Sequence, residues 1–330
     1  MFDVKFTLKT LLTFLALTGV AQAAPAVMGA AAYPEKPIRF VAAFAAGGSI
    51  DLLARLFAQK LTQSVGQQVV VDNRPGAGGS LSAEIVARAP ADGYTIYICA
   101  PSLVVNAALY AKIPYDPLRD FSPVTLLASV QNVLVAYPGL PVKSVKDLVA
   151  LAKSKPGQIN YASTGSGSSG HLVMEMFRSQ TGINLLHVPY KVIGQTTTDL
   201  ISGQVSLWFP TIPGALPHIR GARMRALAVA GARRSSALAE IPTVAEAAAL
   251  PGFDATTWYA VLAPAGVNRG IIGKLNTAFV TALRAQDTQE RLAAQGIESI
   301  GSTPEQLAAH IRSEMPKWAK VVKDAGVRAD

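Results

Sequence analysis

Apolar runs alternate with amphipathic runs along the first part of the chain. Residues 38–44, 69–71 and 94–100 form short apolar or β-branched runs that are typical of strands. Residues 50–65 and 81–89 repeat their apolar positions at the spacing of a helix face. This βαβαβ order predicts a parallel sheet covered by helices.

The alternation restarts in the middle of the chain. Further strands are expected at 132–137, 159–162, 185–190 and 205–209, and further helices at 144–154, 170–181 and 196–202. The apolar run "TTWYAVLAPAG" at 256–266 is suited to carry the chain back to the first sheet. The tail predicts helices at 269–284, 288–295 and 304–324, and "TPEQ" opens the last of these with a capping box.

One arrangement occurs twice. Residues 39–61 and 159–182 each read as a strand, a turn of glycine and serine, and a helix, and Gly47 and Gly167 lie 120 positions apart. Two α/β lobes that each present a helix N-terminus would explain this near-repeat. Two βα units within one large sheet would explain it equally well.

The composition fits an exported globular protein. The chain has 330 residues, of which 50% are hydrophobic and 15% charged, enough for one large or two ordinary domains. Lys5 and Lys9 precede an apolar run, and "AQA" follows it, so residues 1–23 are expected to be a cleaved signal peptide; an uncleaved anchor is the alternative. Cys99 is the one cysteine and makes no internal disulfide; it is expected to be buried.

Charge and motif content argue against several classes of function. The net charge is +9, but the basic residues are scattered without interleaved aromatic residues, so nucleic-acid binding is not expected. The glycines of "GSGSSG" match a dinucleotide fingerprint but lack its acidic partner, and neither a P-loop nor a G-x-S-x-G elbow is present. The four histidines lack metal-ligand spacing, so neither a metal nor a cofactor is expected.

The glycine turns are suited to bind an anion through their backbone. The first N–H groups of a helix have no internal partner, and the helix dipole favours negative charge there. The expected donors are Gly47, Gly48 and Ser49 in the first turn and residues 164–169 in the second. The alternative is that Ser49 and either Ser168 or Ser169 only cap their helices.

Several segments in order resemble one known family. They are "YPEKPIRFVAAFAAGGSIDLLAR", "GQQVVVDNRPGAGGSLSAEIVARAPADGYT", "YASTGSGSSGHL", "HVPYK", "ALPHIRGARMRALAVAGARRSSAL" and "IPTVAEA". Together they resemble the Bug-type substrate-binding proteins, the extracytoplasmic receptors of tripartite tricarboxylate transporters. The resemblance implies an α/β, type II periplasmic binding-protein fold, in which two α/β domains flank a ligand cleft.

The resemblance also implies a domain division. Domain 1 is expected at 33–130 plus 259–330 and domain 2 at 131–258, with hinges near "LLASVQN" and "DATTWYAV". Closure of the domains would trap a small carboxylate, which two integral membrane subunits would then transport.

The predicted ligand-binding residues combine the donor turns, the positions matched to the family and their neighbours. They are Phe44, Ala46, Gly47, Gly48, Ser49, Asp51, Gly78, Ser102, Ser163, Thr164, Gly165, Gly167, Ser168, Ser169, His171, Tyr190, Asp199 and Pro210. Trp208 and Trp258 are expected near the cleft, and His187 is expected to be a core histidine with its hydrogen bonds satisfied. Ala46, Val192, Gln195 and Pro210 depart from the family pattern, so they are expected to affect ligand choice.

The resulting hypothesis is a periplasmic, monomeric, non-enzymatic solute-binding receptor for a small organic anion. A periplasmic sensor that feeds a membrane signalling protein is one alternative. A secreted hydrolase that uses Ser168 or Ser169 is the other.

Overall fold

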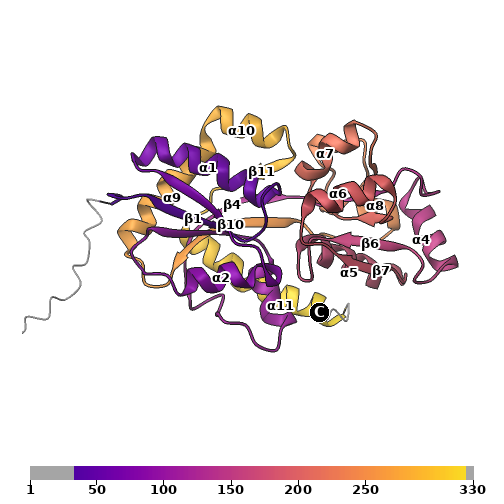
Figure 1. Ribbon diagram of the computed structural model, residues 1–330, viewed down its shortest axis with the longest axis horizontal. Coiled ribbons are helices and arrows are strands. Elements are labelled where there is room, and N and C mark those ends of the chain that lie inside the picture. Colours follow the sequence, from indigo (N-terminus) through magenta and orange to yellow (C-terminus); the bar gives the residue numbers. More distant parts are fainter. Residues whose placement is uncertain (1–32, 325–330) are drawn as a thin grey trace, which may run out of the picture.

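The computed structural model describes residues 33–324, so the predicted signal peptide lies outside the described residues. Figure 1 shows two lobes side by side, each a sheet flanked by helices; β4 and β10 belong to the sheet of six strands. We call the lobe of the six-stranded sheet the first lobe and that of the five-stranded sheet the second lobe. No helix among residues 33–324 is long and apolar enough to cross a membrane.

The first lobe combines the two ends of the described chain. Its sheet has the order β11-β4-β10-β3-β1-β2, in which β1 pairs in parallel with β2 and β3 while β10 runs antiparallel to β3 and β4. Its strands are β1 (Ile38–Ala42), β2 (Val69–Asn73), β3 (Thr95–Cys99), β4 (Phe121–Val130), β10 (Thr257–Pro264) and β11 (Ile297–Ser299). Its helices are α1 (Ser49–Val65), α2 (Ser80–Ala87), α3 (Ser102–Leu109), α9 (Arg269–Arg284), α10 (Gln286–Ala293) and α11 (Pro304–Asp324), with a 3₁₀ turn at Ala77–Gly79.

The second lobe is built from the middle of the chain. Its sheet has the order β7-β6-β8-β5-β9, with β6 parallel to both of its neighbours. Its strands are β5 (Val133–Ala136), β6 (Asn160–Ser163), β7 (Leu186–Pro189), β8 (Leu207–Trp208) and β9 (Arg225–Val229). Its helices are α4 (Val145–Ser154), α5 (Ser169–Thr181), α6 (Ile193–Ser202), α7 (Ile212–Arg220) and α8 (Val244–Ala248), with a 3₁₀ turn at Ser236–Leu238.

Local chemistry fixes several element ends. Ser144 caps α4 by accepting a hydrogen bond from the amide of Asp147, and Thr303 and Gln306 form the predicted capping box of α11. Cys99 is buried as predicted: its Sγ donates to the carbonyl oxygen of Ala260, and burial raises the pKa of its thiol.

Six of the described helices and strands lie outside the sequence predictions: β4, α3 and β11 of the first lobe, and α7, β9 and α8 of the second. Pro123 lies inside β4, where the missing N–H argues against a strand in the middle of a sheet. The structure accommodates Pro123 because β11 pairs only with Ala128 to Val130 and leaves the proline end of β4 unpaired on that side. Pro213 and Pro217 obscure the pattern of α7 in a similar way.

The chain passes between the lobes beside Asn132, which joins the two crossings. The side-chain amide of Asn132 donates to the carbonyl oxygen of Phe209 (2.8 Å) and accepts from the hydroxyl of Thr257 (2.8 Å). The strands of the two sheets fall on either side of the predicted boundaries, except that β10 begins at Thr257, inside the range expected for domain 2. The domain division itself stays a prediction, which this distribution of strands supports.

Candidate functional site

A cavity of about 580 Å³ lies between the lobes, and both glycine turns contribute to its wall. Its size is that of a small-molecule site. The wall contains eleven of the predicted residues: Phe44, Gly47, Gly48, Ser49, Gly78, Thr164, Gly165, Ser168, Ser169, Tyr190 and Pro210. The fold therefore brings the two turns together across the boundary between the sheets.

Four other predicted residues lie behind the wall and hold it in place. Each accepts one hydrogen bond from a neighbouring group: Asp51 from the amide of Gly47 (3.0 Å), Ser163 from the amide of Gly165 (3.1 Å), His171 Nδ1 from the amide of Gly167 (3.1 Å), and Asp199 from the hydroxyl of Tyr190 (2.7 Å). Any effect of these side chains on a ligand would therefore act through the residue that each one supports.

The last three predicted residues, Ala46, Ser102 and Gly167, also lie off the cavity wall. Ala46 is exposed on the first turn, and Ser102 is buried behind Gly79. Gly167 faces the first lobe: a Cβ built there would lie 2.9 Å from Oδ1 of Asn106. Asn106 is fully buried in α3 and has little room to move, so it would clash with a side chain at position 167.

The first turn presents the N-terminus of α1 to the cavity. Gly47 adopts a φ of +91°, which favours glycine, and extended Gly48 then starts the helix. The amides of Ser49 and Ile50 have no acceptor among residues 33–324. Ser49 does not cap the helix, which corrects the alternative that the sequence left open. Its hydroxyl instead lies 2.6 Å from that of Thr211, a residue of the second lobe.

The second turn has the same layout as the first, but its serine makes different contacts. Gly165 and Gly167 have φ values of +109° and +79°, and the amide of Ser168 donates to the carbonyl oxygen of Gly165 (3.1 Å). Ser168 occupies the position before α5, but its side chain makes no capping hydrogen bond. Its hydroxyl is buried, with the residue 2% exposed, and has no partner among the described residues.

Behind the second turn, three rings form a stack. The ring centroids of His171 and His187 lie 4.3 Å apart, and those of His187 and Tyr161 lie 4.9 Å apart. Nε2 of His187 lies 2.6 Å from the hydroxyl of Ser163, so His187 is satisfied as predicted. Tyr161 donates to the carboxylate of Glu175, and burial, together with the charge of Glu175, raises the pKa of Tyr161.

The rest of the wall comes largely from positions that the sequence did not single out. Tyr110, Asn132, Phe209, Thr211 and Tyr259 come from separate segments that meet only in the fold. Burial raises the pKa of Tyr259, so its hydroxyl stays protonated near neutral pH. No local pattern marks these positions, because each one belongs to an ordinary strand, loop or helix end.

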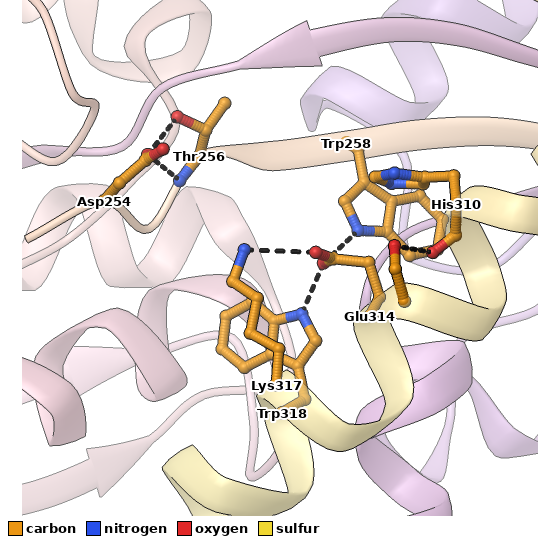
Figure 2. A network of polar contacts seen from close by, with 8 residues as sticks. Asp254, Thr256, Trp258, His310, Glu314, Lys317 and Trp318 are labelled. Carbon is orange, nitrogen blue, oxygen red and sulfur yellow. Dashed lines mark hydrogen bonds and ion pairs between the residues drawn. The ribbon is translucent and has the colours of Figure 1, made fainter. Parts of the chain in front are cut away.

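The two tryptophans expected at the cleft differ. Trp208 lies on the wall, as predicted. Trp258 does not: its indole donates to the buried carboxylate of Glu314 (2.7 Å), which also accepts from Trp318 and pairs with Lys317 (Figure 2). The indole N–H of Trp258 is therefore bonded to α11 and is not available to the cavity.

The electrostatics of the wall favour binding by dipoles. Among residues 33–324, the wall carries one charged side chain, the exposed Lys191. The described residues contain no cluster of three or more His, Cys, Asp or Glu side chains that could hold a metal ion. Ser168 has no hydrogen-bonded base among them, so the arrangement needed for a serine nucleophile is not formed. The arrangement instead offers N–H groups and the hydroxyl of Ser168 to an anion.

Comparisons with known proteins agree on one family. The family described as "Tripartite tricarboxylate transporter family receptor" matches residues 53–327. "Protein BugT" of Bordetella pertussis is 38% identical over 317 residues, which is 96% of each protein. A Pseudomonas protein, "UPF0065 protein in tcbD-tcbE intergenic region", is 39% identical over 299 residues, 91% of this chain and 89% of its own length.

Solved structures show the same likeness. The "Structure of periplasmic binding protein BugD" has a TM-score of 0.86 at 32% identity and covers 90% of this chain and 100% of its own. "R. palustris Rpa4515 with adipate" has a TM-score of 0.87 at 37% identity with the same coverage. "MatC (Rpa3494) from Rhodopseudomonas palustris with bound malate" has a TM-score of 0.83 at 31% identity and covers 88% and 100%.

Proposed function

The chain belongs to the tripartite tricarboxylate transporter receptor family, and from this premise we propose that it captures a small organic carboxylate between its two lobes. One similar structure is that of the periplasmic binding protein BugD, and two others contain adipate and malate. The location is accordingly the periplasm. Removal of residues 1–23 during export is part of the proposal.

The hydroxyl of Ser168 is the observation that carries the proposal. A buried hydroxyl without a partner is costly, because it has lost its water without gaining a hydrogen bond. Ser168 lies on the cavity wall at the N-terminus of α5. As at the start of any helix, the first N–H groups of α5 have no acceptor within the helix. A carboxylate oxygen at this point would satisfy the hydroxyl and interact favourably with the helix dipole.

The turn of the first lobe supports the same ligand chemistry. The N-terminus of α1 borders the same cavity, and the wall offers no carboxylate that would repel an anion. An anion between the two helix ends would link the lobes, because each lobe supplies donors that the other lacks. Ligand capture and closure of the lobes would then be one event.

The finer proposal is a monomeric, non-enzymatic receptor that delivers its ligand to a permease with two integral membrane subunits. A hydrolase that uses Ser168 would need a base hydrogen-bonded to its hydroxyl, which no described residue provides. A hydrolase that uses Ser169 is tested by the ester assay below, with both serines replaced by alanine. The receptor should bind its ligand stoichiometrically and leave it chemically unchanged.

The test is a binding panel on the exported form, residues 24–330, with adipate, malate, citrate, glutamate and benzoate. Calorimetry should give saturable one-to-one binding of at least one carboxylate, with a matching rise in melting temperature. Fluorescence of Trp208, on the wall, should change in the same titration. Incubation with a chromogenic ester tests the hydrolase. Absence of saturable binding across the panel, or turnover that is lost when Ser168 and Ser169 are both replaced by alanine, would contradict the receptor.

A further inference from the structure

The second turn is held from behind by its two histidines. The amide of Gly167 donates to Nδ1 of His171 at 3.1 Å. The amide of Gly165 donates to the hydroxyl of Ser163, which in turn lies 2.6 Å from Nε2 of His187. Both glycines have φ values near +80° to +110°, so these bonds fix a backbone conformation that the turn needs in order to present Ser168.

The bond from Gly167 requires a neutral imidazole. A neutral ring has one nitrogen that accepts and one that donates, whereas an imidazolium donates from both. Protonation of His171 at Nδ1 would set an N–H group against the amide N–H of Gly167 and remove the bond. Since His171 is only 4% exposed, water has little access to replace it.

The surroundings of His171 do little to favour a cation there. On its own helix, Glu175 is paired with Arg178 (2.6 Å) and accepts from Tyr161 of β6. From β7, the ring of His187 stacks on His171, and two cations at that separation would repel each other. Helix α11, which packs against α5, carries the paired Glu314 and Lys317, and the first lobe presents the neutral Asn106.

We propose that His171 is a positioning residue for the anion site, and that it supports ligand binding only while its imidazole is neutral. The inference rests on the proposed function of the cavity and adds its regulation. Acid would break the bond between Gly167 and His171, let the turn relax and weaken the carboxylate complex. Burial and the stacked ring of His187 disfavour the imidazolium, so affinity should fall only as acid overcomes this preference for the neutral form.

The first experiment uses the ligand-free protein and does not depend on the ligand class. Protein labelled with ¹⁵N-glycine and ¹⁵N-histidine is titrated by NMR from pH 8 to pH 5. We expect His171 to carry its proton on Nε2 at pH 8, and the Gly167 amide resonance to move with the His171 titration. A proton on Nδ1 at pH 8, or a Gly167 amide that does not follow His171, would overturn the proposal.

The second experiment measures adipate binding by calorimetry at pH 7.5 and pH 5.5. The wild type should bind more weakly at pH 5.5, where a larger fraction of the His171 imidazole is protonated than at pH 7.5. His171→Asn keeps an acceptor where Nδ1 lies but cannot be protonated, so most of this difference should disappear while affinity at pH 7.5 stays within about threefold. Protonation of adipate itself is common to all the proteins and cancels in the comparison.

His218→Asn is the matched control, because His218 lies in the last turn of α7, whereas His171 lies on α5 behind the second turn. It should keep the pH ratio of the wild type. Equal ratios in wild type and His171→Asn would overturn the positioning role even though adipate binds. If adipate does not bind at any pH, the same comparison is made with a carboxylate of the panel that does bind. If none of the panel binds, the ligand class of the proposed function fails, and the NMR titration still decides the role of His171.

Discussion

The two glycine turns share one layout, but different chemistry holds them. In the first turn, the carboxylate of Asp51 accepts from the amide of Gly47 and pairs with Arg55 on the same helix. In the second turn, the matching amide of Gly167 is held by a neutral imidazole inside a ring stack. The comparison teaches that a shared backbone pattern does not fix how a turn responds to pH.

The turns also differ in what they offer a ligand. The hydroxyl of Ser49 is used across the cleft on Thr211, whereas the hydroxyl of Ser168 has no partner among residues 33–324. A Cβ at Gly47 would meet nothing within 4 Å, whereas one at Gly167 would meet Asn106 of the other lobe. We infer that the first turn contributes amides and a contact between the lobes. The second turn contributes the hydroxyl of Ser168 and packs closely against Asn106 of the first lobe.

The largest expected effect comes from placing valine at each glycine. Gly167→Val should weaken carboxylate binding about a hundredfold, because it adds strain at a φ of +79° and a contact 2.9 Å from Asn106. Gly47→Val adds only the strain at its φ of +91°, so roughly a tenfold loss is expected. Calorimetry with the best ligand of the panel measures both.

Circular dichroism should show both valine variants folded, since the strain is a small part of the stability of a domain. Gly182→Val is the control, because Gly182 has a similar φ of +65° at the far end of α5 and open space around it. It should leave affinity unchanged. Equal losses at Gly47 and Gly167 would mean that contact with the first lobe plays no part in binding.

The glycine turns could be found from the sequence because their signal is local. Glycine and serine between an apolar run and an amphipathic run predict a strand, a turn and a helix start. The bounds of α9 and α11 were likewise predictable, because a long helical repeat and a capping box lie within one segment. β4 was missed because Pro123 interrupts a strand whose pairing depends on segments far away in the sequence.

The remaining parts of the site could not be read locally. Thr211 and Tyr259 reach the cavity only because the chain crosses twice between the lobes. The resemblance to a family pointed to His171 and Asp199 but did not say what they touch. In the structure Asp199 supports the wall residue Tyr190, and His171 supports Gly167, which precedes the wall residue Ser168. The sequence motifs thus located the site, but only the fold shows which residues line the cavity and which hold the lining residues in place.

Removing the two hydroxyls sharpens the comparison further. Ser168→Ala should weaken binding about tenfold and leave the free protein at least as stable, because the lost hydroxyl had no partner to forfeit. Ser49→Ala should weaken binding only about threefold, because it removes one contact to Thr211 rather than a donor to the ligand. Paired calorimetry and thermal melts separate the two. A larger loss for Ser49→Ala would reverse the assignment of roles.

The carboxylate under the first turn predicts a different pH range. Burial acts to raise the pKa of Asp51, but hydrogen bonds from Arg55 and Gly47, and the charge of Arg55, hold it below its ordinary value of 3.8. A lowered pKa in the folded protein means stability that is present above about pH 4 and lost as the pH falls further. Asp51→Asn should therefore cost about 1 kcal/mol of unfolding free energy at pH 7.

Urea titrations at pH 7 and pH 3 check this prediction. The difference between wild type and Asp51→Asn should be smaller at pH 3 than at pH 7, because the stabilisation by the charged carboxylate is lost progressively as the pH falls below about 4. Between pH 5.5 and pH 7.5 the first turn should not respond to acid, in contrast to the turn that His171 holds. A difference that persists unchanged at pH 3 would show that the charge of Asp51 does not stabilise the turn.

The smallest effect concerns Ala46, where the resembling family tends to have proline. The φ of +91° at Gly47 fits the third residue of a type II turn, which makes Ala46 the second residue, where proline is favoured. Ala46→Pro should then stabilise the protein by about 0.5 kcal/mol by restricting the unfolded chain, and Ala46→Gly should destabilise it by a similar amount. Urea unfolding of the matched pair measures this. If Ala46→Pro destabilises the protein, the backbone at position 46 is not that of a type II turn, and the first turn differs from the second in shape as well as in support.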